Sequence, residues 1–323
     1  MRRSLVQLLV LAFVAGILAG CGSSSDRALR MTLAALDTTA TAPSPAPPPT
    51  PERRCGDVTA SLRPPAVMPG PGAMPAGSFM ARIERRGYLV AGVDQNTLLF
   101  AYFNPLDHQI EGFEIDMLRE LAKAIFGSPN DIEFKAITTA ERIPAVQDGS
   151  VDIVADAMTI TCQRRQQVDF SSVYYDAGQR ILVPSNSPAR SIKDLGGKRV
   201  CATIGSTSIQ TLKALVPRPI PYGVPQRTDC LVAMQQGLVD AITSDDSILL
   251  GFKAQDPYTK IVGRRFADEP YGMAISKAHS DFVRFVNGVL AKVRADGAWR
   301  HIYHRWLGKF ASTPAPPPAH YLP

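Results

Sequence analysis

Apolar and polar positions switch between two periods along the middle of the chain. Runs of strand length that are rich in apolar residues occur at 88–94 (YLVAGVD), 131–137 (DIEFKAI) and 151–157 (VDIVADA). Between the first two, residues 112–127 place apolar side chains at helical spacing, and this run stops at Gly127. Strands separated by helices predict an α/β fold with mainly parallel sheets flanked by helices.

The same pattern starts again after residue 184. Strands are predicted at KRVCATIG (198–205), VDAITSD (239–245) and YTKIVG (258–263), and helices at TSIQTLKALV (207–216), TDCLVAMQQG (228–237) and DSILLGFKAQD (246–256). A last strand is expected at 271–276 and one long helix at 279–308. Two such runs predict two lobes. Lobe 1 comprises residues 81–183 and 267–311, and lobe 2 comprises residues 184–266.

The N-terminus has the pattern of an export signal. The cationic start MRRS precedes the apolar run LVQLLVLAFVAGIL, and LAGC follows at Leu18–Cys21. These four residues resemble the bacterial lipobox, in which the cysteine carries acyl chains and becomes the new N-terminus; an ordinary secretory signal with a chance cysteine is the alternative. Residues 1–20 are therefore a predicted signal peptide. Lipidated Cys21 would hold the protein on the outer face of the cell membrane, since several acyl chains anchor stably.

Proline, alanine, serine and threonine dominate both flanks of the two-lobed unit. Residues 21–80 contain stretches such as TATAPSPAPPPTPERR, and residues 312–323 are STPAPPPAHYLP. Because such composition offers little apolar surface to bury, we expect a flexible tether and a proline-rich tail.

Composition and charge exclude several classes of protein. Hydrophobic residues at 45% and charged residues at 20% are typical of a soluble globular protein. The net charge of +6 falls by two, to +4, when Arg2 and Arg3 leave with a signal peptide. No basic cluster is interleaved with aromatic residues, so nucleic acid is not an expected partner.

Four cysteines remain after Cys21: Cys55, Cys162, Cys201 and Cys230. In an exported chain an even number suggests two disulfides, and spacing alone leaves three connectivities open. Neither Cys-x-x-Cys nor His-x-x-x-His occurs, so no metal and no cofactor are expected.

One phrase occurs in both runs. AVQDGSVDIVADAMT and AMQQGLVDAITSDDS each read as an apolar helix, a glycine, Val-Asp, an apolar strand and a polar end. We interpret this as two similar lobes that present their strand ends to a shared crevice, because ligands of open α/β sheets bind outside those ends.

The polar residues at the strand ends are the candidate ligand-binding residues. Lobe 1 supplies Asp94, Arg164 and the run Asp156, Ala157, Met158 and Thr159; lobe 2 supplies Asp245 and Gly205, Ser206 and Thr207. Singly, each has a simpler structural explanation as a cap or a surface charge. Together, a cation, an amide-rich helix start and a carboxylate suit a zwitterion, with its carboxylate on Arg164 and its ammonium on Asp245.

Several of these blocks resemble a known family. VDIVADAMTITCQRRQQVDFSSVYY, LGGKRVCATIGSTS and DGAWRHIYHRWLG are similar to the polar amino-acid solute-binding proteins of ABC importers (family 3), and most of all to the actinobacterial glutamine/glutamate-binding lipoproteins of the mycobacterial GlnH type. The resemblance covers about residues 82–310. It implies a two-lobed, type II periplasmic-binding fold with a two-strand hinge near Arg180–Pro184 and Ala267–Ser276.

The resemblance also implies residue roles. Arg164 would grip the ligand carboxylate and Asp245 the ammonium, whereas Arg165 would face water. Further contacts are implied for the carbonyl of Ala157, the hydroxyl of Thr159 and the amides of Ser206 and Thr207. For the cysteines it implies the pairs Cys201–Cys230 and Cys55–Cys162.

This sequence departs from the family at three points. Thr97 and Thr139 stand where members usually stack aromatic rings on the ligand. Asp156 stands where a small or neutral residue is usual. Arg142 matches an arginine that acid-binding members use against a side-chain carboxylate, but pairing with Glu141 or Asp156 on the surface is an equal alternative. The expected ligand is glutamate, aspartate or one of their amides, and Asp156 leaves a cationic ligand open.

The expected function is capture of a polar amino acid and delivery to an ABC importer permease. An amino-acid sensor that signals through a membrane partner is the alternative, since the sequence does not separate the two. Dehydratases also exist on this fold. No histidine or cysteine lies beside a nucleophile in the proposed crevice, so an enzyme is not expected.

Overall fold

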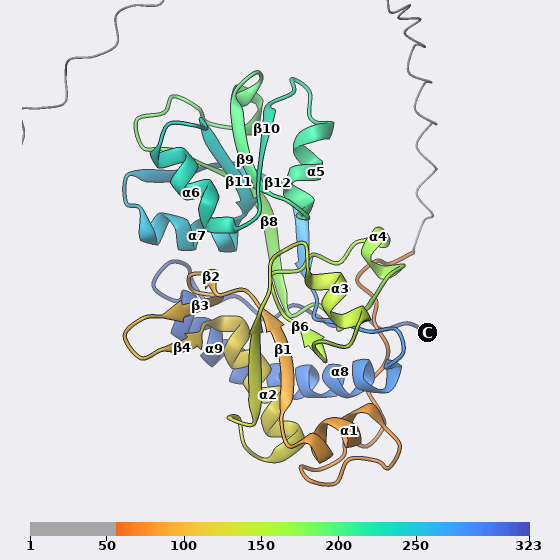
Figure 1. Cartoon of the computed structure of the whole chain (residues 1–323). Helices are drawn as coiled ribbons and strands as arrows, with labels where there is room; N and C mark the ends of the chain where they lie inside the picture. Colours follow the sequence, from red (N-terminus) through yellow and green to blue (C-terminus); the bar gives the residue numbers. More distant parts are fainter. Residues whose placement is uncertain (1–55) are drawn as a thin grey trace, which may run out of the picture. The chain divides into compact units, whose positions relative to one another are not determined.

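The structure is a computed structural model that describes residues 56–323. The predicted signal peptide, Cys21 and Cys55 lie outside the described residues. The described chain contains two five-stranded sheets and one three-stranded sheet, and Figure 1 shows the two large sheets in separate lobes. Within residues 56–323, no helix combines the length and the apolar character needed to span a bilayer.

Lobe 1 is built on a sheet with the strand order β5-β1-β6-β13-β7. Its strands are β1 (Leu89–Val93), β5 (Ile132–Ala136), β6 (Ile153–Val154), β7 (Asp169–Phe170) and β13 (Ala274–Ile275). Strand β1 pairs in parallel with β5 and β6, whereas β13 runs antiparallel to β6 and β7. The helices of this lobe are α1 (Phe79–Arg86), α2 (Phe113–Phe126), α3 (Arg142–Gln147), α4 (Cys162–Arg165), α8 (Ser280–Ala295) and α9 (Ala298–Leu307).

Lobe 2 repeats this order as β10-β9-β11-β8-β12. The strands are β8 (Tyr175–Pro184), β9 (Arg199–Thr203), β10 (Ile220–Val224), β11 (Ala241–Asp245) and β12 (Thr259–Tyr271), with helices α5 (Thr207–Ala214), α6 (Arg227–Gln235) and α7 (Asp246–Gln255) and the 3-10 helix η1 (Ile192–Leu195). Strands β10, β9 and β11 are parallel, and β8 runs against them. The predicted fold class, two α/β lobes with sheets flanked by helices, is confirmed. The sheets are mixed and not mainly parallel, because two strand pairings in each are parallel and two are antiparallel.

The helices form where the apolar spacing predicts them. Helix α2 buries its apolar stripe, which includes Phe113, Met117 and Leu121, and Gly127 ends it in the left-handed region at φ 82°. The predicted helix over 279–308 is instead two helices. Gly297 takes φ 83° between α8 and α9, and this left-handed turn breaks the helix, because only glycine adopts it without strain.

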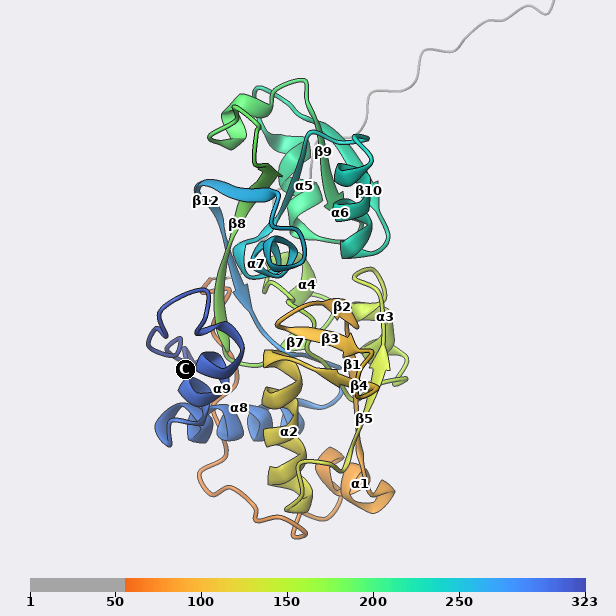
Figure 2. The same cartoon turned by 90° about the vertical axis from the view of Figure 1, so that its left-hand side faces the viewer.

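Two long strands connect the lobes. Strands β8 and β12 pair antiparallel from Tyr175↔Tyr271 to Pro184↔Thr259, with a bulge between Val262 and Ala267, and both views show them side by side (Figures 1 and 2). Residues 179–182 already pair with β11 in lobe 2. The crossover in β8 therefore comes a few residues before the predicted Arg180–Pro184.

A small sheet projects from lobe 1 toward lobe 2. It consists of β2 (Asn96–Thr97), β3 (Ala101–Asn104) and β4 (Gln109–Glu111), in that order. Gly251 of helix α7 packs so closely against the carbonyl of Leu98 that a Cβ at Gly251 would lie 2.6 Å from that oxygen. The two lobes are thus in contact, and the conformation is closed.

The end of the predicted tether is folded against lobe 1. Ser61 forms a parallel bridge with Tyr321 in the proline-rich tail, and it donates to the carbonyl of Phe170 at 2.6 Å. Asn287 on α8 donates to both Ser61 and Leu62 at 2.7 Å. Because these hydrogen bonds satisfy the backbone of a segment poor in apolar side chains, residues 57–63 and the tail are parts of lobe 1.

Candidate functional site

A narrow pocket lies where the strand ends of the two lobes meet. Its lining is mainly polar and is made of Thr139, Arg142, Ala157, Thr159, Arg164, Thr203, Ser206, Thr207, Ser208, Arg227, Ser244, Asp245 and Ile248. In this closed conformation it has room for about one water molecule. Any larger molecule must enter while the lobes are apart or displace side chains.

Arg164 reaches the pocket from α4. The hydroxyl of Thr161 caps this short helix by accepting the Arg164 backbone N–H at 3.2 Å. The guanidinium is buried and donates to the carbonyl of Thr159 at 2.7 Å and, across the lobes, to that of Gly205 at 3.1 Å. Burial, and then the charge of Arg142, lower the pKa of Arg164 to about 9. The side chain is still a cation at neutral pH.

Arg142 lies beside Arg164 and is equally buried. It donates to the carbonyl of Thr139 at 2.9 Å and to that of Asp156 at 3.0 Å. Its closest carboxylate is that of Asp156, at 3.8 Å, whereas Glu141 turns away to accept the backbone N–H of Thr138. Pairing with Asp156 is therefore real, but it occurs in the interior and not on the surface.

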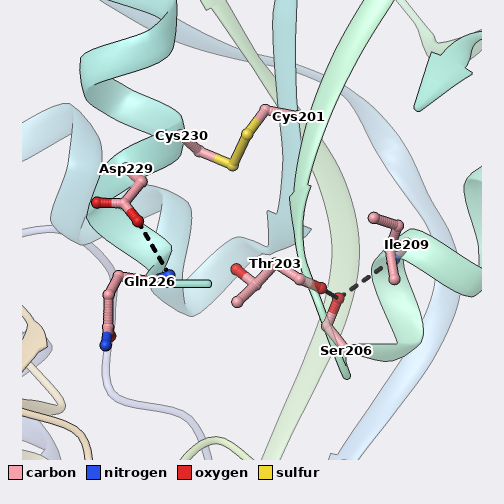
Figure 3. Close-up of a disulfide and its surroundings, with 7 residues drawn as sticks. All are labelled: Cys201, Thr203, Ser206, Ile209, Gln226, Asp229 and Cys230. Atoms are coloured by element: carbon pink, nitrogen blue, oxygen red, sulfur yellow. Dashed lines mark hydrogen bonds between the residues drawn. A yellow bond between two sulfur atoms is a disulfide. The ribbon is translucent and has the colours of Figure 1, made fainter. Parts of the chain in front are cut away.

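The predicted anion seat opens helix α5. Ser206 caps this helix by accepting the N–H of Ile209 at 3.2 Å and donates to the carbonyl of Thr203 at 2.6 Å (Figure 3). Gly205 takes φ 82°, and a Cβ there would lie 3.1 Å from Ala140 of lobe 1. Glycine thus supplies both the turn and the close approach of the two lobes.

Asp245 ends strand β11 on the other side of the pocket. One carboxylate oxygen accepts the hydroxyl of Tyr271 at 2.6 Å. The other, Oδ1, is buried, and no described residue donates to it. Burial, and then the nearby Glu269 carboxylate, raise the pKa of Asp245. A buried oxygen without a donor can accept a hydrogen bond from a cationic or N–H group that enters the pocket.

Arg227, which no motif or strand end in the sequence marks, completes the site. It is the first residue of α6 and is 5% exposed; its Nη1 lies 2.5 Å from Asp94 and 2.5 Å from Asp156, both in lobe 1. Burial alone would raise the pKa of Asp94, but the charge of Arg227 and the hydrogen bond from Thr97 lower it below its ordinary value. Burial raises the pKa of Asp156 despite Arg227 and Arg142.

Four predicted residues do not line the pocket. Asp94 and Asp156 lie behind it and contact Arg227. Gly205 contributes only its carbonyl oxygen, which accepts from Arg142 and Arg164. Met158 is 1% exposed and packs in a hydrophobic cluster with Ile160 and Phe170. Its side chain therefore belongs to the core, whereas its neighbours Ala157 and Thr159 line the pocket.

A disulfide fixes the lobe 2 side of the site. Cys201 on β9 and Cys230 on α6, the pair that the resemblance implies, are joined (Figure 3). The bond ties the strand that leads to Ser206 to the helix that begins at Arg227. Cys162 is also disulfide-bonded; Cys55, its expected partner, lies outside the described residues. Among the residues described, no group of His, Cys, Asp or Glu is arranged to hold a metal ion.

Arg165 does not face water as expected. Its guanidinium donates to the carbonyls of Val58 and Ala60 at 3.0 and 2.5 Å. The adjacent arginines of α4 therefore point in different directions, Arg164 into the pocket and Arg165 onto the segment that precedes α1.

Comparison with known proteins identifies the family. Residues 89–309 match the bacterial extracellular solute-binding proteins, family 3. The chain belongs to this family. It is 37% identical over 229 residues to the ABC transporter glutamine-binding protein GlnH of Bacillus subtilis (strain 168), covering 71% of this chain and 84% of the relative. It is also 37% identical over 206 residues to a glutamine-binding protein of Geobacillus stearothermophilus, covering 64% of this chain and 79% of the relative.

Solved structures of amino-acid-binding proteins share the fold. An ancestral arginine-binding protein, solved with glutamine and with arginine, superposes with a TM-score of 0.64 at 34% identity, over 69% of this chain and 99% of that protein. The family consists of solute-binding proteins, and its description places them outside the cell. The pocket between the lobes is accordingly the candidate solute-binding site.

Proposed function

We propose that this protein captures a polar amino acid between its two lobes outside the cytoplasmic membrane and delivers it to an ABC importer. Glutamine and glutamate are the first candidates, followed by asparagine and aspartate. The observation that carries the proposal is that Arg164 and Asp245, which have opposite charges and come from different lobes, line one buried pocket.

The two ends of an amino acid fit these two residues. The Arg164 guanidinium donates to two backbone carbonyls; a carboxylate would be a stronger acceptor, because charge-assisted bidentate hydrogen bonds exceed neutral ones. The hydroxyl of Thr207 and the start of α5 lie beside it. The ammonium would donate to Oδ1 of Asp245, the buried oxygen without a donor, and would hold that carboxyl ionised.

Arg142 favours an acidic or amide side chain. Its guanidinium lies in the pocket next to Thr139, and the carbonyl oxygens that it contacts are neutral. A carboxylate or amide oxygen of the ligand could accept from it. The glutamine-binding names of the two relatives at 37% identity agree with this assignment.

Binding would be coupled to lobe closure. The groups for the carboxylate and for the ammonium come from both lobes, so all contacts are made only in the closed conformation. The strands β8 and β12 are the covalent connections about which the lobes would open. An importer would then recognise the closed form.

Lipid attachment at Cys21 would keep the protein beside its membrane partner. The proposal includes release of the amino acid unchanged, without chemical conversion. A sensor would bind the same ligands but would not support uptake, so uptake of radiolabelled amino acid in a deletion strain separates the two roles.

The binding proposal is tested by a thermal-shift screen of the twenty amino acids. A ligand stabilises by RT ln(1 + [L]/Kd), which is about 2.7 kcal/mol at a hundredfold excess over Kd. We expect glutamine or glutamate to raise the melting temperature most. A screen in which no amino acid raises it would overturn the proposal.

A further inference from the structure

The guanidinium of Arg227 crosses from lobe 2 into a pair of lobe 1 carboxylates. Its Nη1 contacts Asp94 and Asp156, each at 2.5 Å, and its Nη2 donates to the carbonyl of Asp156 at 3.2 Å. Thr97 donates to the same oxygen of Asp94 that Arg227 contacts, at 2.5 Å. Both acids are almost completely buried. Two buried carboxylates this close to one cation would repel each other without it.

The position of Arg227 is not explained by the stability of its own helix. A cation at the first residue of a helix faces the positive end of the helix dipole, which is unfavourable. Two contacts nevertheless fix the position of the helix start that carries Arg227. Gln226 accepts from Asn96 of lobe 1 at 3.4 Å, and Cys230, one turn further along, is joined to β9 by the disulfide. The arginine is therefore presented to lobe 1 by a fixed scaffold.

The charges of the pocket leave no place for a basic side chain. Three arginines, Arg142, Arg164 and Arg227, line it. Asp94 and Asp156, behind the pocket, already contact Arg227. Asp245, the carboxylate among the lining residues, is the one assigned to the ligand ammonium. The nearby carboxylate of Glu269 accepts from Thr159 and Thr207. A second cation on the ligand would stand among three guanidiniums.

We propose that Arg227 is an internal counter-cation that occupies, between Asp94 and Asp156, the position a basic ligand side chain would take, and so makes the pocket reject arginine and lysine. This deepens the proposed function and rests on it. The fold itself does not decide which ligand side chain is accepted, because a 34% identical protein of the same fold has been solved with glutamine and with arginine. Ligand preference then depends on local charges in the site, such as that of Arg227.

The test compares ligands on the full chain purified in mild detergent. Wild type, R227M and R227Q are titrated with glutamine, glutamate, arginine and lysine by calorimetry, with thermal unfolding in parallel. R305M is the control, since Arg305 forms an exposed pair with Asp116 at 3.3 Å, away from the pocket. We expect wild type and R305M to bind glutamine or glutamate and to bind arginine at least about 100-fold more weakly, a difference of about 2.7 kcal/mol.

In the variants the preference should move toward the basic ligands. R227M removes the cation that the two acids share, so arginine should bind at least about 30-fold more tightly than to wild type and should raise the melting temperature. R227Q removes the charge but keeps side-chain donors, which covers the case in which R227M does not fold. The double variant D94N/R227M should lose most of the gain for arginine.

The results distinguish a failure of the proposed function from a failure of the proposed role of Arg227. Wild type that binds no amino acid contradicts the proposed function. Wild type that binds arginine as tightly as glutamine contradicts the role of Arg227 without any variant. Variants that keep glutamine binding and still exclude arginine and lysine contradict it as well.

Discussion

The hydroxyl oxygens of Thr159 and Thr207 lie 3.5 Å apart although the two residues belong to different lobes. Both donate to one carboxylate oxygen of Glu269, Thr207 at 2.8 Å. Glu269 is on β12, the strand that connects the lobes, and it is 2% exposed. One carboxylate thus joins lobe 1, lobe 2 and their connection, but only when the lobes are closed.

Removing the Glu269 carboxylate should destabilise the closed conformation and so weaken ligand binding. In Glu269→Ala the hydroxyls of the buried Thr159 and the half-buried Thr207 lose their shared acceptor, which costs the closed form about 1–3 kcal/mol. Calorimetry with glutamine should show a correspondingly larger Kd, whereas Glu269→Gln, which keeps an acceptor oxygen, should show a smaller effect. Asp268→Asn, on the exposed neighbour, is the control. Equal affinities for all four proteins would contradict the role of Glu269 in closure.

Arg164→Ala should nearly abolish binding. The ligand carboxylate would be buried without its partner, at a cost of about 3–5 kcal/mol. Arg165→Ala is the matched control, because Arg165 is adjacent in sequence but donates to Val58 and Ala60. Calorimetry should give unchanged affinity for this control. Near-normal affinity of Arg164→Ala would remove Arg164 from the site.

Asp245→Asn should weaken only the interaction with the ligand ammonium. The substitution replaces a charged acceptor by a neutral amide, so glutamine should bind about 2–5 kcal/mol more weakly. The deamino analogue of glutamine has no ammonium, and its weak binding should change little between wild type and variant. Equal losses for both ligands in this double-mutant cycle would show that Asp245 has a structural role only.

Glu114 should make stability depend on pH. Burial, and then the charge of Asp156, raise its pKa from an ordinary 4.5 to about 7; its carboxylate accepts the N–H of Ala157 and the hydroxyl of Tyr174. Between these pH values the folded protein binds more protons than the unfolded chain. Stability from this group is therefore complete below about pH 4.5, falls as pH rises to about 7, and is constant above it.

The expected size of this effect is about 3 kcal/mol, since each pKa unit corresponds to about 1.4 kcal/mol. Glu114→Gln has no charge to bury, so its free energy of unfolding should fall less between pH 5 and pH 8 than that of wild type. Urea unfolding at the two pH values measures the difference. Parallel pH dependence in the two proteins would mean that Glu114 is not the group responsible.

The sequence pattern predicted the regular elements because their apolar spacing is local. Helix α2 and strand β1 bury the side chains that the pattern marks as apolar. Strands β2 to β4 escaped prediction because they have two to four residues and little apolar character. The break at Gly297 had a local signal, a glycine inside a helical pattern, but the apolar positions on both sides outweighed it.

The site was predictable only where family motifs or strand ends marked it. Arg164, Thr159 and Asp245 were found in this way. Arg227 was not, because its partner Asp94 is 133 positions away in the chain and an arginine at a helix start resembles any surface charge. For the same reason Asp94 and Asp156 were assigned to the ligand: from sequence alone, a buried carboxylate does not disclose whether its cation comes from the solute or from the other lobe.

The bridge between Ser61 and Tyr321 fixes the C-terminal tail to lobe 1, so the tail can serve as a reference for measuring the motion of lobe 2. Because residue 61 and the C-terminal tail are fastened to the same lobe, a dye coupled to Pro323 would be a stationary reference point. A second dye on α5 would then report only the swing of lobe 2. A fusion partner or a solid support attached at the C-terminus would likewise leave that swing unhindered.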